Sequence, residues 1–172
     1  MSKTRIFTIV RKVAIVFILL MLCATGFLSI ARVSGSSMRP TFLDGSFGIS
    51  VKLDDYQYGD VVLAKVTIDG KEYDIIKRIM GKRGDVVSIK GSECCINGNP
   101  AEWQFSTKED VKHTVVGDYY LLGDNRDVST DSRDFGDVMA SQIYGKYYDI
   151  ASSNQTIALA CVTIFALVVL IL

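Results

Sequence analysis

An uncharged apolar run at each end of the chain constrains its fold more than any other feature. The first run extends from Val13 to Ala31, about nineteen residues, which is long enough for a helix to span a bilayer. A cleaved signal peptide is the alternative interpretation, but its apolar region usually has about 7–15 residues. The sequence therefore predicts a transmembrane helix over residues 13–31, preceded by a basic tail at residues 1–12.

The C-terminal run contains no charged residue from Thr156 to Leu172. As a helix it would reach about 25 Å, a little less than the thickness of the hydrocarbon core. We expect a second transmembrane helix over residues 155–172. A hairpin-like or interfacial anchor is the alternative.

The distribution of charge predicts the topology. Four basic residues and no acidic residue lie in the first twelve positions, while the other 15 basic and all 19 acidic residues lie between the apolar ends, which gives that part a net charge of −4. By the positive-inside rule, the N-terminus is cytoplasmic and residues 32–150 lie on the outer face of the cytoplasmic membrane. The chain shows no basic surface for nucleic acid, and we expect the lipid bilayer as a partner.

The part between the apolar ends has the pattern of an all-β domain. Alternation and turn residues predict strands at residues 47–51, 61–66, 73–80, 86–90, 93–96, 115–122 and 143–148. Asp69-Gly70 is a strong hairpin signal. No amphipathic helix is apparent between Arg32 and Asp149, so we expect antiparallel hairpins that form a partly closed sheet core. Residues 86–118 are predicted to form a small accessory β subdomain, capped by Trp103 and Phe105.

A serine-rich turn follows the first apolar run. Residues 33–42 read V-S-G-S-S-M-R-P-T-F, and Ser37 is the candidate nucleophile. A serine hydroxyl needs a nearby base and donors for the oxyanion that forms on attack, and Gly35 allows the chain to turn tightly beside it. The alternative interpretation of this stretch is a Ser/Gly linker.

Lys77 is the candidate base. Side chains alternate along a strand, so Tyr73, Ile75, Lys77 and Ile79 share one face, the more apolar one. Burial disfavours the ammonium form and lowers the pKa of a lysine, which makes the free amine available as a base. An edge lysine that reaches out to water is the alternative.

An acidic segment follows the predicted strand at residues 115–122. Residues 124–137 contain five aspartates and two arginines, which is compatible with an exposed loop or a calcium loop. The arginines interrupt the pattern of calcium ligands. A pair between Asp131 and Arg133 could instead hold Ser129 against Lys77.

The cysteines and the histidine offer little alternative chemistry. Cys23 and Cys161 lie in the apolar ends, and the adjacent Cys94 and Cys95 could close only a strained ring. With a single histidine, His113, there is no zinc set, and we predict neither a metal nor a cofactor. His113 has no motif around it, so a Ser–His–Asp triad is the weaker mechanism.

Four separated motifs together resemble the bacterial type I signal peptidases. They are S-M-R-P-T at residues 37–41, G-D-V-V at 59–62, Y-D-I-I-K-R-I-M-G-K-R-G-D at 73–85 and G-D-N-R-D-V-S-T-D-S-R-D-F-G at 123–136. They occur in the order found in that family and cover most of the chain between the apolar ends. The resemblance implies a membrane-anchored serine endopeptidase that removes signal peptides from exported proteins, after small residues, without a cofactor.

The resemblance also implies roles for individual residues. Ser37 matches the nucleophile and Lys77 the general base of a Ser–Lys dyad. Ser129 matches the serine that hydrogen-bonds the lysine, and Asp131 with Arg133 matches the supporting ion pair.

The turn before Ser37 departs from the pattern of some members of that family. Those members have a serine at the position of Gly35, and its hydroxyl helps to bind the oxyanion. Here the oxyanion is expected to depend on backbone donors, chiefly the Ser37 N–H. Met38 and Phe42, beside Ser37, are expected to contact the substrate or the membrane interface.

Two other functions remain as alternatives. One is a self-cleaving repressor-type protease, which the apolar ends and the motif at residues 123–136 oppose. The other is a signal-peptidase-like factor that assists the assembly of surface fibres (pili) without cleaving. The presence of both Ser37 and Lys77 favours an enzyme.

The charge distribution generates a topological prediction. Protease added outside intact cells should digest the region between residues 32 and 149, and a reporter fused after Leu172 should stay cytoplasmic, because two spans return the chain to the inner side. Protease protection and reporter activity measure the two outcomes. An extracellular reporter would exclude the two-span topology.

Overall fold

The computed structural model describes residues 3–24, 28–107 and 110–149. Its helices are α1 (Lys3–Ala24), α2 (Ser132–Phe135) and the 3₁₀ turn η1 (Ala140–Gln142). Its strands are β1 (Leu28–Arg32), β2 (Phe47–Val51), β3 (Val61–Ile68), β4 (Lys71–Lys82), β5 (Val86–Lys90), β6 (Glu93–Ile96), β7 (Asn99–Pro100), β8 (Val111–Thr114), β9 (Tyr119–Leu122) and β10 (Ile143–Asp149).

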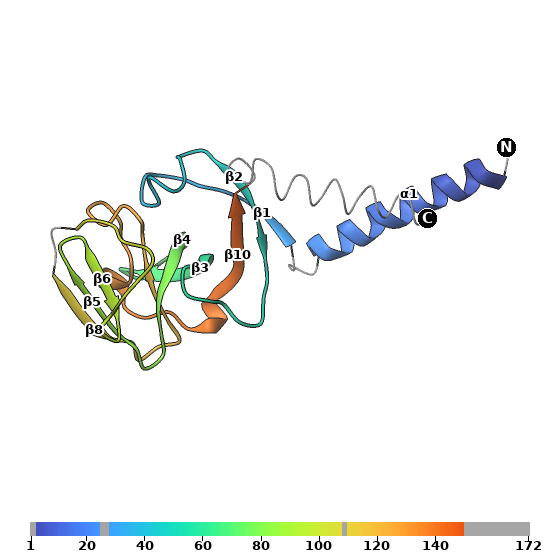
Figure 1. Cartoon of the computed structure of the whole chain (residues 1–172). Coiled ribbons are helices and arrows are strands. Elements are labelled where there is room, and N and C mark those ends of the chain that lie inside the picture. The colour runs from blue at the N-terminus through green and yellow to red at the C-terminus, as the bar shows by residue number, and fades with distance from the viewer. Residues whose placement is uncertain (1–2, 25–27, 108–109, 150–172) are drawn as a thin grey trace.

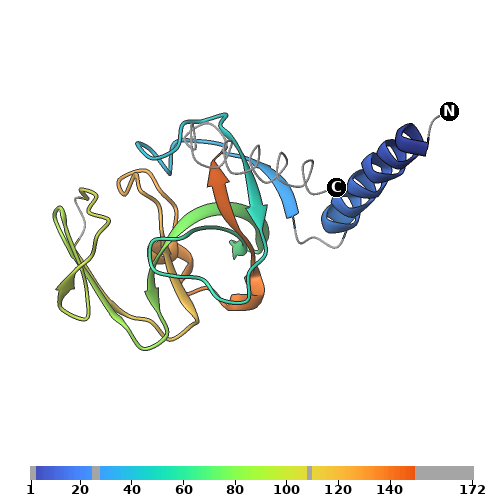
Figure 2. The ribbon, with the colours of Figure 1, turned by 45° about the vertical axis from the view of Figure 1, so that its right-hand side comes forward.

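The strands form two antiparallel sheets. The larger has the order β1-β2-β10-β3-β4-β9, and the smaller has the order β7-β6-β5-β8. The smaller sheet lies at the end of the domain away from α1 (Figure 1), and β4 leads from the larger sheet toward it (Figure 2). The prediction of a mostly β domain built from antiparallel strands is confirmed.

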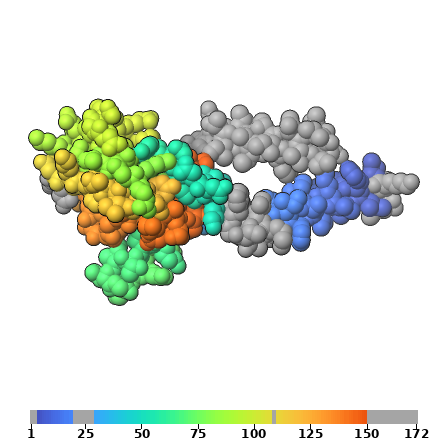
Figure 3. Space-filling model, turned by 90° about the horizontal axis from the view of Figure 1, so that it is seen from below, coloured from blue at the N-terminus to red at the C-terminus, as the bar shows by residue number. Residues whose placement is uncertain are grey.

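The β3–β4 hairpin is the longest pairing in the larger sheet. Its register runs from Val61 opposite Arg78 to Ile68 opposite Lys71. The turn residues Asp69 and Gly70 have φ of 50° and 76°, as a two-residue hairpin turn requires. Figure 3 shows the tip of this hairpin, in green, projecting from the body of the domain.

β4 changes its partner strand at Arg78. β3 pairs with β4 from Lys71 to Arg78, and β9 pairs with it from Arg78 to Lys82. Within the described part of the chain, the first half of β4 therefore has one edge with no partner strand. Lys77 is the last residue of β4 before its pairing with β9 begins at Arg78.

β4 and β9 also lie between two hydrophobic cores. Ile79 and Leu121 belong to the core on one side, whereas Met80 and Leu122 belong to the core shared with the smaller sheet. All four residues of β9 are buried because successive side chains of a strand point to opposite faces. The residues of β4 next to Ile79 are consequently held in a tightly packed part of the molecule.

The helix predicted over residues 13–31 is wrong at its C-terminal end. α1 ends at Ala24, and β1 pairs antiparallel with β2, from Leu28 opposite Val51 to Arg32 opposite Phe47. This pairing satisfies the backbone groups of β2 along an edge that would otherwise be open. The absence of charge, from which the helix was predicted, does not distinguish a helix from a strand.

The helices that the structure describes do not establish the two predicted membrane spans. No helix within residues 3–24, 28–107 and 110–149 is both long and apolar enough to cross a membrane. The second predicted span, residues 155–172, lies outside the described residues.

The strand predicted over residues 115–122 is also wrong in its first half. β8 ends at Thr114 and β9 begins at Tyr119. Between them, the Asp137 carboxylate accepts hydrogen bonds from the Val116 and Gly117 N–H groups, at 2.7 and 2.9 Å. These side-chain bonds replace ladder bonds and turn the chain from the smaller sheet into the larger one.

Candidate active site

The loop that carries Ser37 joins β1 to β2 and is closed locally. Gly35 has φ of 89°, a region that glycine adopts without strain, and its N–H donates to Asp44 Oδ1 at 2.9 Å. Met38 and Phe42 anchor the loop to the core. They are only 1% and 8% exposed and pack in one apolar cluster with Tyr147.

The burial of these two side chains corrects their predicted membrane contact. Burying an apolar side chain lowers the free energy of the folded state. Here β3 and β10 form the apolar surface on which Met38 and Phe42 pack. Phe42 packs edge-to-face on Tyr147, with ring centroids 5.2 Å apart. Met38 does line a cavity next to Ser37, so it remains a candidate for substrate contact.

Lys77 lies within hydrogen-bond distance of Ser37, 40 positions earlier in the chain. The distance from Lys77 Nζ to Ser37 Oγ is 2.9 Å. Lys77 is only 4% exposed, so its amine does not reach out to water. Burial lowers the pKa of Lys77, and the charges of Asp131 and Asp124 partly oppose this shift. The site thus contains a serine hydroxyl and a buried amine whose neutral form is favoured.

The segment after β9 supplies an ion pair behind Lys77. Arg133 Nε and Nη2 donate to the two oxygens of Asp131 at 2.8 and 2.9 Å. Asp131 is fully buried, accepts the Gly123 N–H at 3.0 Å and is the N-cap of α2. The structure therefore forms the pair that the sequence proposes. It adds a one-turn helix that the sequence does not predict, because four residues are too few to show a helical period.

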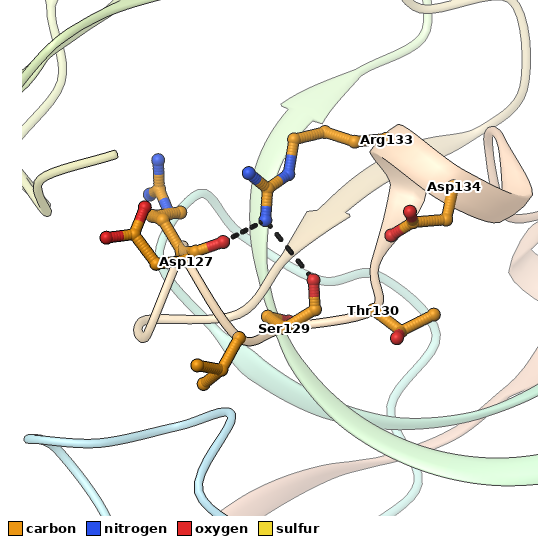
Figure 4. Close-up of a pocket in the computed structure, with 7 residues that line it drawn as sticks. Asp127, Ser129, Thr130, Arg133 and Asp134 are labelled. Atoms are coloured by element: carbon orange, nitrogen blue, oxygen red, sulfur yellow. Dashed lines mark hydrogen bonds between the residues drawn. The ribbon is translucent and has the colours of Figure 1, made fainter. Parts of the chain in front are cut away.

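Ser129 lies beside this pair, but its hydroxyl is not engaged. Its Oγ is buried and has no hydrogen-bond partner in the described part of the chain, so the predicted bond to Lys77 is not formed in this structure. The Ser129 carbonyl accepts from Arg133 Nη2 at 3.3 Å (Figure 4). A Cβ on Gly123 would lie 2.1 Å from Ser129 Oγ and 2.7 Å from the Ser37 carbonyl oxygen. The missing side chain of Gly123 is what lets these two serines approach.

Sequence reasoning missed a second buried ion pair. Arg78 Nε and Nη2 donate to the two oxygens of Asp124 at 2.8 and 2.6 Å, and Nη1 donates to the Gly59 carbonyl at 2.7 Å. Asp124 also accepts the Thr41 hydroxyl. The Asp124 carboxylate therefore joins β4 to the Ser37 loop. Both partners lie in motifs quoted above, but no local pattern pairs residues 46 positions apart.

Backbone contacts reinforce the same junction. The Asn125 N–H donates to the Ser37 carbonyl at 2.9 Å, and Asn125 Nδ2 donates to the Ser36 carbonyl at 3.2 Å. The segment after β9 thus holds the Ser37 loop through both backbone and side chains.

Three cavities surround these residues. A groove of about 490 Å³ is lined by both Ser37 and Lys77 together with Tyr73 and Thr130, and a smaller cavity of about 140 Å³ lies between Ser37, Met38 and Ile76. A third, of about 400 Å³, lies behind Val128 and Thr130, among the polar side chains of residues 126–134 (Figure 4). The first two expose the serine and the lysine to a ligand.

The histidine and the cysteines lie elsewhere. His113 is on β8, where its Nε2 is 2.7 Å from Asp137 Oδ1 and its ring stacks on Tyr120 at 4.7 Å. It lines neither cavity next to Ser37, so the geometry does not favour a Ser–His–Asp triad. Cys94 and Cys95 are free thiols in β6.

Comparison with known proteins identifies the family. The family model described as signal peptidase, peptidase S26, matches residues 6–150. The chain therefore belongs to the S26 signal peptidases. Membership of the S26 family confirms the resemblance seen in the sequence and makes the protein a serine peptidase that acts on substrates bearing signal peptides.

Individual relatives are similar over most of their length. Signal peptidase IB of Staphylococcus aureus strain COL is 29% identical over 169 residues, covering 84% of this chain and 88% of the relative. The protein of the same name from strain Mu50 is 30% identical over 159 residues, covering 78% and 83%. Signal peptidase I of Bacillus licheniformis is 29% identical, covering 77% and 80%.

A solved structure is also similar. The crystal structure of a signal peptidase I from Enterococcus faecalis V583 has 26% sequence identity and a TM-score of 0.46, and the match covers 55% of this chain and 98% of that one.

The Asp131–Arg133 pair generates a prediction about stability. Asp131→Asn should lower the free energy of unfolding by about 3–5 kcal/mol, because it removes a buried carboxylate that pairs with a largely buried guanidinium. Glu72→Gln is the matched control: Glu72 pairs with Lys65 on the surface, and its loss should cost at most about 1 kcal/mol. Urea titration measures both. If the two variants lowered the free energy of unfolding equally, the buried pair would contribute no more to stability than the surface pair.

The buried Lys77 generates a second prediction about stability. Its pKa is lowered from the ordinary value of 10.5, so between the lowered pKa and 10.5 the unfolded chain binds more protons than the folded one. Stability should therefore rise with pH through that window. Lys77→Met should stabilise the protein at neutral pH, and its advantage should shrink toward about pH 10.5. Thermal unfolding at several pH values measures this, and a Lys77→Met advantage that did not change with pH would contradict it.

Proposed function

We propose that this chain is a membrane-anchored type I signal peptidase in which Ser37 is the nucleophile and Lys77 the general base. One observation carries the proposal: Lys77 Nζ lies 2.9 Å from Ser37 Oγ at a buried position of β4. A base must lie within hydrogen-bond reach of the proton that it removes, and burial lowers the pKa of Lys77, which favours the neutral amine.

The chemistry follows from this pair. Neutral Lys77 takes the proton of the Ser37 hydroxyl as Oγ attacks the carbonyl carbon of the scissile peptide bond. The resulting ammonium gives its proton to the leaving amine, which departs as the N-terminus of the mature protein. Lys77 then removes a proton from a water molecule as the water oxygen attacks the ester carbon on Ser37. The ammonium returns this proton to Ser37 Oγ as the C–Oγ bond breaks, which releases the signal peptide and restores the neutral amine.

The backbone around Ser37 limits the donors available for the oxyanion. The Gly35 N–H is already bonded to Asp44, and we assign the Ser37 N–H to this role. A serine at position 35 would have to adopt φ of 89°, a backbone conformation that residues other than glycine rarely adopt. The departure at Gly35 therefore fits the conformation of this loop.

The first half of β4 has one edge without a partner strand in the described part of the chain, and this edge is suited to bind an extended peptide. A peptide strand can add to an exposed sheet edge through main-chain hydrogen bonds, with pockets for alternate side chains. Such an edge ends at Lys77, beside the groove that also contains Ser37. The cavity of about 140 Å³ between Ser37 and Met38 suits a small side chain, which supports cleavage after small residues.

We assign a supporting role to Ser129, Asp131 and Arg133. The Asp131–Arg133 pair fixes the backbone around Ser129, because Arg133 also holds the Ser129 carbonyl. The unengaged Ser129 hydroxyl is free to turn toward the Lys77 amine and orient its lone pair toward Ser37.

We further propose that α1 anchors the enzyme in the cytoplasmic membrane, with the N-terminus inside, residues 32–150 outside and a second span at residues 155–172. Large apolar side chains along α1 are exposed, Val13 and Phe17 among them, and such a surface needs an apolar environment. Residues 86–118, which include the smaller sheet, form the accessory subdomain.

The alternative of a non-cleaving factor for pilus assembly has less support. The relatives reported above are named signal peptidases, and both proposed members of the dyad are present here and in contact.

The dyad generates a prediction about activity. Cleavage of a signal-peptide substrate should rise with pH as Lys77 loses its proton. Lys77→Met should abolish cleavage, and so should Lys77→Arg, because a guanidinium stays protonated. Ser37→Ala should be equally inactive, and the double variant should lose little more, since residues that act as one unit are not additive.

The matched control is His113→Ala, which removes the base of the rival triad. It should keep near-normal cleavage. If His113→Ala lost activity while Lys77→Met kept it, the dyad would be excluded.

A further inference from the structure

Two aromatic side chains from the smaller sheet's side of the molecule lie over buried arginines. The Cζ atom of Arg78 is 5.7 Å from the centroid of a Trp103 ring and 6.0 Å from that of Phe105, and the Cζ atom of Arg126 is 5.6 Å from Phe105. The sequence predicted Trp103 and Phe105 only as a cap for the subdomain. They also connect it to the segments that hold Ser37 and Lys77.

Arg126 has an unusual need for such a neighbour. It is only 2% exposed, and its Nε donates to the Gly123 carbonyl at 2.9 Å. Its Nη1 and Nη2 atoms are buried without a hydrogen-bond partner in the described residues. Besides the Phe105 ring, the Cys94 thiol and the charges of Asp131 and Asp124 act on the guanidinium. The negative face of an aromatic ring therefore supplies part of what hydrogen-bond acceptors would otherwise provide.

Arg78 is held by Trp103 in two ways. The indole covers the guanidinium, and it also packs directly on Gly59, where an added Cβ would lie 1.9 Å from Trp103 Cζ2. The Gly59 carbonyl is an acceptor of Arg78 Nη1. Trp103 thus positions both the guanidinium and one of the groups to which it bonds.

Arg78 and Arg133 limit the negative charge that acts on Lys77. Asp124 and Asp131 are the carboxylates that raise the Lys77 pKa against the effect of burial. Arg78 neutralises Asp124, and Arg133 neutralises Asp131. The Arg126 carbonyl in turn accepts from Arg133. A further carboxylate, Asp74, lies on β4 and lines the same cavities as Lys77.

We propose that Trp103 and Phe105 are positioning residues for the Ser37–Lys77 pair, acting through Arg78 and Arg126. On this proposal, which rests on the proposed function, residues 101–107, after β7, are part of the apparatus that keeps Lys77 available as a base. Loosening Arg78 from Asp124 leaves more negative charge near Lys77, favours its ammonium form and moves the onset of activity to higher pH.

The test compares Trp103→Leu with Trp103→Phe in the full-length protein, reconstituted in detergent micelles. The measurement is kcat/KM for an internally quenched signal-peptide substrate between pH 6 and 10. Trp103→Leu should raise the midpoint of the rising limb by about half a pH unit. Below the midpoint, this shift lowers kcat/KM approximately threefold, and at high pH kcat/KM should return to the wild-type value. Trp103→Phe keeps an aromatic face and should keep the wild-type midpoint. Phe105→Leu and Phe105→Tyr should behave as a second such pair, and they decide the matter if Trp103→Leu does not fold.

Val111→Ala is the matched control. Val111, on β8, packs against the same apolar cluster as Trp103 but offers no aromatic face. It should lower the melting temperature without moving the midpoint. The proposal is overturned if both leucine variants keep the wild-type midpoint, or if Val111→Ala shifts it equally.

Failure of the dyad itself would look different. It would appear as a wild-type profile without a rising limb, or as a Lys77→Met variant that still cleaves. A normal rising limb in the wild type, together with unshifted leucine variants, would remove only the positioning role of Trp103 and Phe105.

Discussion

The burial of an amine beside a serine hydroxyl is the constraint on which the rest of the structure depends. A lysine is rarely buried without a partner, and Lys77 remains so because β4 is fixed by β3 on one side and, from the next residue, by β9 on the other. Two carboxylates near the amine would favour its charged form, and each is bound by an arginine. The ion pairs thus allow the carboxylates to organise the backbone while limiting their effect on Lys77.

The same carboxylates also position Ser37. Asp124 bonds both Arg78 and Thr41, and the adjacent Asn125 holds the backbone of the Ser37 loop. Gly123 leaves the space in which the loop and Ser129 meet. Segments that are distant in the sequence therefore converge on one short stretch after β9, which explains why its polar composition is compatible with a packed interior.

The sequence predicted features that arise from local patterns. The β3–β4 hairpin follows from Asp69-Gly70 between two alternating runs. Alternation alone does not explain the burial of Lys77, because Arg78 on the opposite face of β4 is buried as well. The motifs suggested Ser37 as the partner of Lys77. The Arg78–Asp124 pair, the burial of Met38 and the stacking of Trp103 on Arg78 depend on contacts between distant segments, which leave no local period. β1 was missed because an uncharged apolar run suits a strand as well as a helix.

The position of β9 has a consequence for how the domain unfolds. With both faces buried against different cores, this strand cannot lose one core and keep the other, and β4 shares this arrangement. We therefore expect the two sheets to unfold as one cooperative unit, in which the amide hydrogens of β9 exchange with solvent when the whole domain opens. The β3–β4 tip, outside both cores, can fray without disturbing them.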